Sequence, residues 1–346
     1  MELYIGIDVS LELSSVCVMD RSGAILREMK VASEPDALLA FCNSLDAPPT
    51  LVGLEAGPLS QWLYAGLKDA GVAAVLMETR HVKGALAAMP VKTDRRDAEG
   101  MAHLLRMGWF RPVHCKSASS QEARALLASR KLLVSKAVDI ELGIRGVLRG
   151  FGMKIGKVSK GRFADRVREL AAGNPVLEQA SEAMLQALSA LRDQIAGLHR
   201  RVLATVRADE VCALLMSAPG VGPITALTYK SAIDDPTRFS SSKQVGPHFG
   251  LTPKKHQSGE KDVDGSITRA GDASVRAVLY EAASVLLTRT QSFSTLKSWG
   301  LRVAQRRGLK RATVAVARKL AVVLHRMWVE GEPFRFTEKQ GAAAPA

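Results

Sequence analysis

The first 115 or so residues alternate short apolar runs with amphipathic stretches. Residues 4–10 have the pattern of a buried strand, and residues 15–19 followed by Ser22-Gly23 have that of its hairpin partner. Further strands are expected at 24–31, 50–55 and 72–77, with helices at 34–45, 59–70 and 94–107. A hairpin followed by alternating helices and strands predicts a mixed α/β sheet.

The middle of the chain has a different period. Apolar positions recur at alternating intervals of four and three residues, which is a heptad stripe. The stripe consists of Leu126, Arg130, Leu133, Ala137, Ile140, Ile144 and Val147, and then Leu177, Ser181, Met184, Leu188, Leu191, Ile195, Leu198 and Val202. Two long helices, separated by a stretch rich in glycine and lysine at 150–161, should form an antiparallel hairpin or pair with another subunit.

The last third is expected to be mainly α-helical. Pro219-Gly220-Val221-Gly222 lies between two helical stretches, the second beginning at Pro223, as in helix-hairpin-helix modules. Gly220 and Gly222 would let the backbone approach a phosphate, although such a turn can equally serve packing alone. The predicted organisation is an α/β domain at 1–115, a helical coiled-coil dimerisation segment at 116–206, a C-terminal domain at 207–336 and a disordered tail at 337–346.

Charge narrows the range of partners. Lys and Arg number 48 against 34 Asp and Glu, a net charge of +14, which favours a polyanionic partner such as nucleic acid or an anionic membrane surface over a merely soluble basic protein. No run of about 18 apolar residues is present, so we expect no membrane span and a cytoplasmic location.

Four carboxylates fall at chemically suggestive places in the predicted α/β domain. Asp8 and Glu55 lie near the carboxyl ends of two predicted strands, where open α/β sheets place their sites. Asp94 and Asp97 project from one face of the first turn of a predicted helix, where aspartates also serve as ordinary caps. A buried carboxylate needs a counter-charge. Four that converge suit Mg²⁺ or Mn²⁺, as one ion or a pair, and phosphoryl transfer.

A second candidate site lies in the C-terminal third. Ser258-Gly259 follows Lys254 and Lys255 in a predicted basic loop that also contains His256. A serine hydroxyl there could attack a phosphate whose charge is offset by cations, including the downstream Arg269 and Arg276. Composition alone does not distinguish Ser258 from an ordinary loop serine.

Both sets of motifs resemble one known family. Gly-Ile-Asp8, Leu-Glu55-Ala-Gly and Lys-Thr-Asp94-Arg-Arg-Asp97-Ala resemble the DEDD signature of an RNase H-like, RuvC-like domain, and more narrowly that of transposases of the insertion-sequence one-ten family, the bridge-RNA-guided recombinases. Gly-Leu-Thr-Pro, Ser258-Gly and Gly-Asp-x-x-x-Arg276 resemble the C-terminal transposase domain of that family. The resemblance extends from Tyr4 to about Phe336.

The resemblance implies more than the residues do. It implies that the four carboxylates hold Mg²⁺, that Ser258 becomes covalently linked to DNA, and that strands are exchanged without ATP. The implied partners are double-stranded target and donor DNA, a non-coding bridge RNA and further copies of the chain, as a dimer or tetramer. The implied location is bacterial and nucleoid-associated.

Three other functions fit parts of the pattern. A hydrolytic junction nuclease would use the same carboxylates with water as the nucleophile. An actin-like kinase also begins with Gly-x-Asp, but its later phosphate and adenosine loops are missing from the sequence. A non-catalytic nucleic-acid scaffold would leave four acids in a basic protein unexplained. Arg95 and Arg96 raise a separate question, because pairing with Asp94 would weaken that residue as a ligand.

Overall fold

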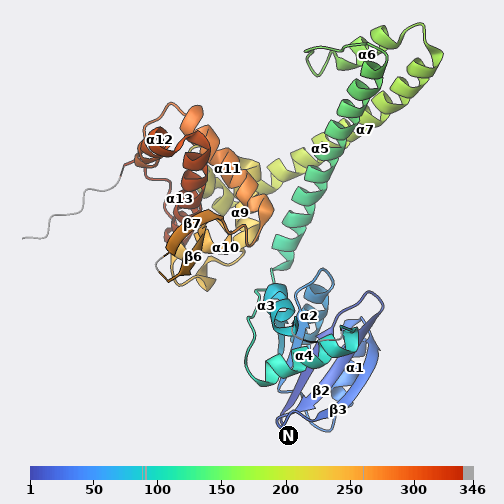
Figure 1. Ribbon diagram of the computed structural model, residues 1–346, viewed down its shortest axis with the longest axis vertical. Helices are drawn as coiled ribbons and strands as arrows, with labels where there is room; N and C mark the ends of the chain where they lie inside the picture. Colours follow the sequence, from blue (N-terminus) through green and yellow to red (C-terminus); the bar gives the residue numbers. More distant parts are fainter. Residues whose placement is uncertain (88, 90–91, 260, 338–346) are drawn as a thin grey trace, which may run out of the picture. The chain divides into compact units, whose positions relative to one another are not determined.

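The structure is a computed structural model that describes residues 1–87, 89, 92–259 and 261–337. The chain divides into two compact units, Met1–Lys116 and Ser117–Ala346 (Figure 1). The predicted boundary at residue 115 falls next to this division, and the predicted segments 116–206, except Lys116, and 207–336 lie in the second unit. The predicted disordered tail lies outside the described residues except for Thr337.

The first unit contains a sheet with strand order β3-β2-β1-β4-β5. The strands are β1 (Leu3–Asp8), β2 (Leu13–Asp20), β3 (Ile25–Ala32), β4 (Leu51–Glu55) and β5 (Ala74–Met77). The first three are antiparallel, whereas β1, β4 and β5 are parallel. The sequence prediction of a hairpin followed by a mixed α/β sheet is therefore confirmed.

Helices cover both faces of this sheet (Figure 1). They are α1 (Pro35–Asn43), α2 (Ser60–Asp69), α3 (Thr79–Leu86) and α4 (Asp94–Arg106). Odd-numbered residues of β1, such as Ile5 and Ile7, pack in one core with α1 and α2. Tyr4 on the other face belongs to the cluster that includes α4 residues. Helix α3 was not expected from the sequence, because its eight residues carry only one fully buried side chain, Val82.

Two long helices open the second unit. Helices α5 (Ala118–Gly150) and α7 (Pro175–Arg207) run antiparallel along each other, with the short helix α6 (Phe163–Ala171) between them in sequence (Figure 1). The predicted stripe residues are buried or half-buried, except Val147, whose place is taken by the fully buried Leu148. Of the two predicted arrangements, the chain itself forms the antiparallel hairpin.

The rest of the second unit packs around a large helical core. Its elements are α8 (Glu210–Met216), α9 (Pro223–Ile233), η1 (Pro236–Arg238), η2 (Ser242–Gln244), α10 (Val245–His248), β6 (Pro253–Ser258), β7 (Lys261–Ile267), α11 (Ala273–Thr288), α12 (Thr295–Arg307) and α13 (Leu309–Glu330). The core joins α8, α9, α11 and α13 with the C-terminal end of α7. Within the described residues, none of the helices is long and apolar enough to cross a membrane.

The turn at Pro219–Gly222 has a packing role. Gly220 has a φ of +85°, and a Cβ there would lie 2.3 Å from the carbonyl oxygen of Ala282 on α11. Only glycine satisfies both constraints. The predicted helix-turn-helix exists, with Gly222 as the N-cap of α9 and Pro223 in its first turn. Phosphate binding by Gly220 and Gly222 stays a prediction.

Candidate active site

Two of the four predicted carboxylates lie side by side at one edge of the sheet. Strands β1 and β4 are parallel neighbours, and their last paired positions are Ile7 and Leu54. Asp8 and Glu55 are the next residue on each strand and the last of each. Both side chains are partly buried. The carboxyl ends of two parallel strands therefore bring two acids from distant parts of the chain together.

Two glycines bring the other two carboxylates to the same face. Gly6 and Gly53 are paired across β1 and β4, each two residues before a strand-borne acid and so on its face of the sheet. A Cβ on Gly6 would lie 2.1 Å from the carbonyl oxygen of Ala98 in α4, and one on Gly53 would lie 2.7 Å from Leu105. The paired glycines let α4 lie directly on the strands that carry Asp8 and Glu55.

The first turn of α4 supplies Asp94 and Asp97. Thr93 is its N-cap, and the Thr93 hydroxyl oxygen accepts a hydrogen bond from the backbone N–H of Arg96 at 3.3 Å. The N–H of Asp97 donates to the carbonyl oxygen of Thr93 at 2.9 Å, which closes the first turn. Capping is thus performed by Thr93, and the two aspartates are not needed for it.

The two arginines inside the acidic motif pair with other acids. The Nε of Arg95 donates to Oε2 of Glu28 on β3 at 2.9 Å. Nη1 of Arg96 donates to Oε2 of Glu99 at 2.8 Å, within α4. Both ion pairs direct a guanidinium to a carboxylate other than Asp94. The possibility that Arg95 or Arg96 pairs with Asp94 and weakens it as a metal ligand is therefore not realised in the structure.

The four carboxylates act on one another electrostatically. Burial, followed by repulsion from Asp94, Asp97 and Glu55, raises the pKa of Asp8 to about 6, and Lys92 opposes this rise. Burial also raises the pKa of Glu55, against a hydrogen bond with Thr79, and repulsion from Asp97 adds to it. An excess of negative charge therefore collects at this edge of the sheet.

The donor set suits a hard divalent cation. Carboxylate oxygens are the ligands that Mg²⁺ prefers, and a cation would offset the repulsion that raises the pKa of Asp8. In the described part of the chain, no three His, Cys, Asp or Glu side chains are already gathered closely enough to hold a metal ion. The four carboxylates suit a divalent cation by their chemistry and charge, and their side chains would have to move closer together to bind it.

The second predicted site lies on a β-hairpin. Strands β6 and β7 pair in antiparallel fashion, and Ser258, the last residue of β6, pairs with Lys261. Ser258 is exposed, and Gly259 follows it with a φ of +56°. Lys254 is exposed and Lys255 forms an ion pair with Asp262 at 3.1 Å. The sequence predicted a loop here because the strand residues are mostly polar and lack the alternation typical of strands.

Arg276 holds the base of this hairpin together. Its Nη1 donates to the carbonyl oxygen of Phe249, ahead of β6, and to those of Ala270 and Gly271, behind β7, at 2.9–3.1 Å. Gly250, with a φ of +65°, abuts Ala270, since a Cβ there would lie 2.1 Å from its carbonyl oxygen. These contacts give a structural role to two of the sequence motifs, Gly-Leu-Thr-Pro and Gly-Asp-x-x-x-Arg276. Both motifs help to fix the hairpin to α11. Arg269 is exposed, with a φ of 55°.

Comparison with known proteins gives the family. A model described as the transposase IS116/IS110/IS902 family matches residues 212–298, and a model of DEDD transposases of the IS110 type matches residues 5–153. A putative transposase, y4pF/y4sB, of Sinorhizobium fredii is 32% identical over 305 residues, covering 85% of this chain and 76% of the relative. The chain belongs to the IS110 family of transposases.

Other relatives agree along nearly the whole chain. The transposase for insertion sequence element IS1111A of Coxiella burnetii is 28% identical, covering 96% of this chain and 91% of the relative. A probable family 20 transposase of Pseudomonas aeruginosa is 26% identical, covering 92% of this chain and 95% of the relative. The protein is thus a transposase, an enzyme that cuts DNA and transfers its strands, and the resemblance drawn from the motifs is confirmed at the level of the family.

The structure brings some predicted site residues of the transposase together and separates others. Asp94, Asp97 and Glu55 lie near enough to Asp8 in the first unit to raise its pKa, whereas Ser258 belongs to the second unit. Sequence reasoning missed the structural importance of Gly6, Gly53 and the base of the hairpin. A signal was present for the glycines, because Gly6-Ile7-Asp8 and Gly53-Leu54-Glu55 repeat the same spacing. The catalytic roles of the four carboxylates and Ser258, and the predicted DNA contacts, stay predictions.

Proposed function

We propose that this transposase is a serine recombinase with a RuvC-like N-terminal domain, in which Asp8, Glu55, Asp94 and Asp97 hold Mg²⁺ and Ser258 attacks DNA. The observation that carries this is that burial and repulsion from Asp94, Asp97 and Glu55 raise the pKa of Asp8 to about 6 at one edge of the sheet. Acids gathered in this way cost stability and have a clear use only when a cation joins them. The strand order β3-β2-β1-β4-β5, with acids at the ends of the two central parallel strands, supports the RNase H-like assignment.

The residues of the chain divide the work. A bound divalent ion would supply Lewis-acid stabilisation of charge on the reacting phosphate. The Ser258 hydroxyl gives up its proton, and its Oγ forms a bond to phosphorus as the phosphorus–oxygen bond of the DNA strand breaks. The departing deoxyribose oxygen takes up a proton, and the reverse sequence rejoins strands. Lys254 and Lys255, exposed on β6, are placed to offset phosphate charge.

The finer partners belong to this proposal as well. A transposase acts on DNA, and here the substrates are double-stranded target and donor sites. The +14 net charge supports binding to them by their backbones. A non-coding bridge RNA and a homo-oligomeric assembly rest on the family resemblance, with the heptad stripe of α5 and α7 as a dimerisation segment. Because the acids and Ser258 lie on different units, two units, from one subunit or from two, must meet over the same phosphodiester.

The structure favours Ser258 over nearby serines as the nucleophile. Ser241 caps η2 by accepting a hydrogen bond from the N–H of Lys243, and Ser240 accepts one from the side chain of Gln244. Ser242 donates to Nδ1 of the buried His325, whose Nε2–H is directed to the carbonyl oxygen of Pro236. These three serines have structural partners, whereas Ser258 is exposed at the end of a hairpin.

The decisive experiment is detection of a covalent protein–DNA adduct. Wild-type protein incubated with Mg²⁺, site-bearing DNA and the RNA co-purified with it should yield DNA that migrates with protein on denaturing gels. Ser258→Ala should reduce this adduct at least about a thousandfold. Ser266→Ala, an exposed serine on the other strand of the same hairpin, is the matched control and should retain it. Cleaved DNA free of protein at every time point would favour the hydrolytic nuclease.

Arg276→Gln should slow adduct formation about a hundredfold without weakening DNA binding more than twofold. Its guanidinium joins both ends of the hairpin that carries Ser258, and a displacement of about 1 Å at a nucleophile has an effect of this size. The adduct rate at saturating DNA and the Kd over a range of salt should both be measured, with Arg276→Lys as the conservative variant that recovers part of the rate. A large rise in Kd with a reduced salt dependence would instead make Arg276 a phosphate contact, the role predicted from the sequence.

A further inference from the structure

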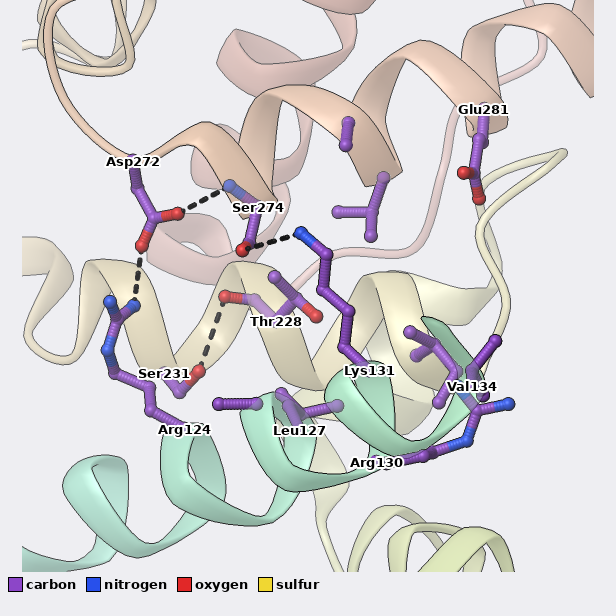
Figure 2. A pocket seen from close by; sticks show the side chains of 14 residues that line it. Arg124, Leu127, Arg130, Lys131, Val134, Thr228, Ser231, Asp272, Ser274 and Glu281 are labelled. Atoms are coloured by element: carbon purple, nitrogen blue, oxygen red, sulfur yellow. Dashed lines mark hydrogen bonds and ion pairs between the residues drawn. The ribbon is translucent and has the colours of Figure 1, made fainter. Parts of the chain in front are cut away.

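A pocket of about 250 Å³ lies in the second unit between α5, α9 and α11 (Figure 2), and none of the residues that line it belongs to β6 or β7. Thr228 and Ser231, both buried on α9, form its floor. Leu127 and Ala128 of α5 and Ala277 and Val278 of α11 also line it, and the two helices lie on opposite sides of it (Figure 2). Two apolar walls above a polar floor suit a flat ring with polar edges, and the volume is just below the ~300 Å³ of pockets that accept drug-sized ligands.

Some of the charged side chains that line this pocket form an ion pair, and others do not. Arg124 and Asp272 neutralise each other through an ion pair of 2.7 Å at one end. Lys131 extends into the middle of the pocket, where its ammonium group donates to the Ser274 hydroxyl at a long 3.5 Å and to no other described residue (Figure 2). Nε of the neighbouring Arg130 is buried and has no acceptor among the described residues. Neither Lys131 nor Arg130 forms an ion pair with any residue that the structure describes.

Glu281 gives the pocket a second kind of group. It projects from α11 at the opposite end from the Arg124–Asp272 pair (Figure 2) and forms no ion pair within the described part of the chain. A carboxylate accepts hydrogen bonds from the amino groups of nucleobases. A ligand that satisfies the whole pocket would therefore carry an anion at one point, a flat apolar body and hydrogen-bond donors at its edge.

We infer that this pocket binds a single unpaired nucleotide. Its phosphate lies against Lys131, its base lies between the α5 and α11 walls, and an amino group of the base donates to Glu281. Unpaired bases are held in this way, between apolar side chains and with their edges hydrogen-bonded. The inference uses the fact that a transposase binds nucleic acid and does not depend on the role of Ser258.

The position of the pocket connects it to the hairpin. Asp272 and Ser274 line the pocket, and Arg276, in the same first turn of α11, holds the base of β6 and β7. A nucleotide in the pocket would contact the turn that fixes Ser258. The pocket is therefore placed to couple the presence of an unpaired nucleotide to the position of that hairpin.

Calorimetric titration of the full-length protein tests the inference with small probes. The titration uses the Ser258→Ala protein without divalent ions. No nucleic-acid strand can then be cut during the experiment, whether or not Ser258 is the nucleophile. We expect dGMP and GMP to bind, and deoxyguanosine or inorganic phosphate alone to bind at least about tenfold more weakly, since each lacks one set of contacts. Nucleotide binding no tighter than that of phosphate would overturn the inference.

Variants locate the binding. Lys131→Gln removes the central cation and Ala277→Leu fills the pocket without changing its charge, and each should weaken nucleotide binding about tenfold or more. Lys136→Gln makes the same charge change on the same helix, where Lys136 is exposed and paired with Asp139, and should have less than a twofold effect. Unchanged binding in both pocket variants would place the nucleotide elsewhere and refute the assignment.

The source of the nucleotide is settled with oligonucleotides. Duplex DNA and duplex RNA with one unpaired guanosine are compared with fully paired duplexes of the same length. A preference for either bulged form that Lys131→Gln abolishes would support the inference and identify the strand as DNA or RNA. No preference for either bulge would contradict it.

Discussion

Replacing Asp8 with asparagine is expected to lower DNA cleavage about a thousandfold while leaving the first unit folded. The substitution keeps the shape and removes one charge from the cluster of four acids, whose proposed role is to hold a divalent ion. Cleavage of site-bearing DNA at saturating Mg²⁺ is the measurement. Asp46→Asn, an exposed aspartate outside the site, serves as the control and should behave as wild type.

Asp8→Asn should stabilise the folded protein although it abolishes most of the cleavage activity. Since the pKa of Asp8 is raised from 3.8 to about 6, its ionised form is less favourable in the folded protein than in the unfolded chain, and the stability it contributes at low pH is lost between about pH 4 and pH 6. At pH 7.5 without metal, Asp8→Asn should therefore raise the unfolding midpoint by roughly 2–5 °C, on the order of 1 kcal/mol after solvent screening.

Addition of Mg²⁺ separates a metal site from a structural cluster. Mg²⁺ should raise the unfolding midpoint of the wild type, because a ligand that binds only the folded state stabilises it, and should have little effect on Asp8→Asn. Equal stabilisation of both proteins would place the ion elsewhere. Full cleavage by Asp8→Asn would remove the basis of the proposed mechanism.

Gly6→Val should destabilise the first unit by about 3 kcal/mol or more. A Cβ at this position would lie 2.1 Å from the carbonyl oxygen of Ala98 and 2.5 Å from the amide nitrogen of Ala102, so α4 would have to move off the sheet. Because α4 carries Asp94 and Asp97, any molecules that still fold should cleave DNA poorly. Denaturant unfolding followed by near- and far-ultraviolet circular dichroism measures the loss.

A matched glycine tests whether contact with α4 is the cause. Gly84 lies within α3, and a Cβ there would meet nothing within 4 Å. Gly84→Ala should therefore be neutral or stabilise by up to about 1 kcal/mol, because alanine is the better helix former. If Gly6→Ala and Gly6→Val unfold at the wild-type denaturant concentration, α4 is not held where the structure places it.

The sequence predicted those parts of the transposase that local pattern determines. The strands that carry Asp8 and Glu55, the helix beginning at Asp94 and the heptad stripes of the two long helices all follow from periodicity and capping. The pairing of Gly6 with Gly53 could not be predicted, because it depends on which strands become neighbours. The fold and family are thus accessible from local signals, while the geometry that collects the acids is not.

The β6–β7 hairpin and the pocket show a different limit. A strand composed of Pro253 to Ser258 has no apolar face to reveal it, and contacts at its base, above all those of Arg276, define it instead. The pocket is formed by side chains from three helices, and its unsatisfied cations appear ordinary in the sequence. Such features arise from packing between distant segments and are visible only in three dimensions.

The hairpin of α5 and α7 has a consequence for how this protein can vary in size. Its two helices share one core near α6 and another with α8, α9, α11 and α13, and a stripe with a seven-residue period connects the two. Adding seven residues to both helices would lengthen this spacer by about 10.5 Å and keep its outer end in nearly the same rotation. Adding three or four would turn the outer end around the axis, so natural changes in its length should come in whole heptads.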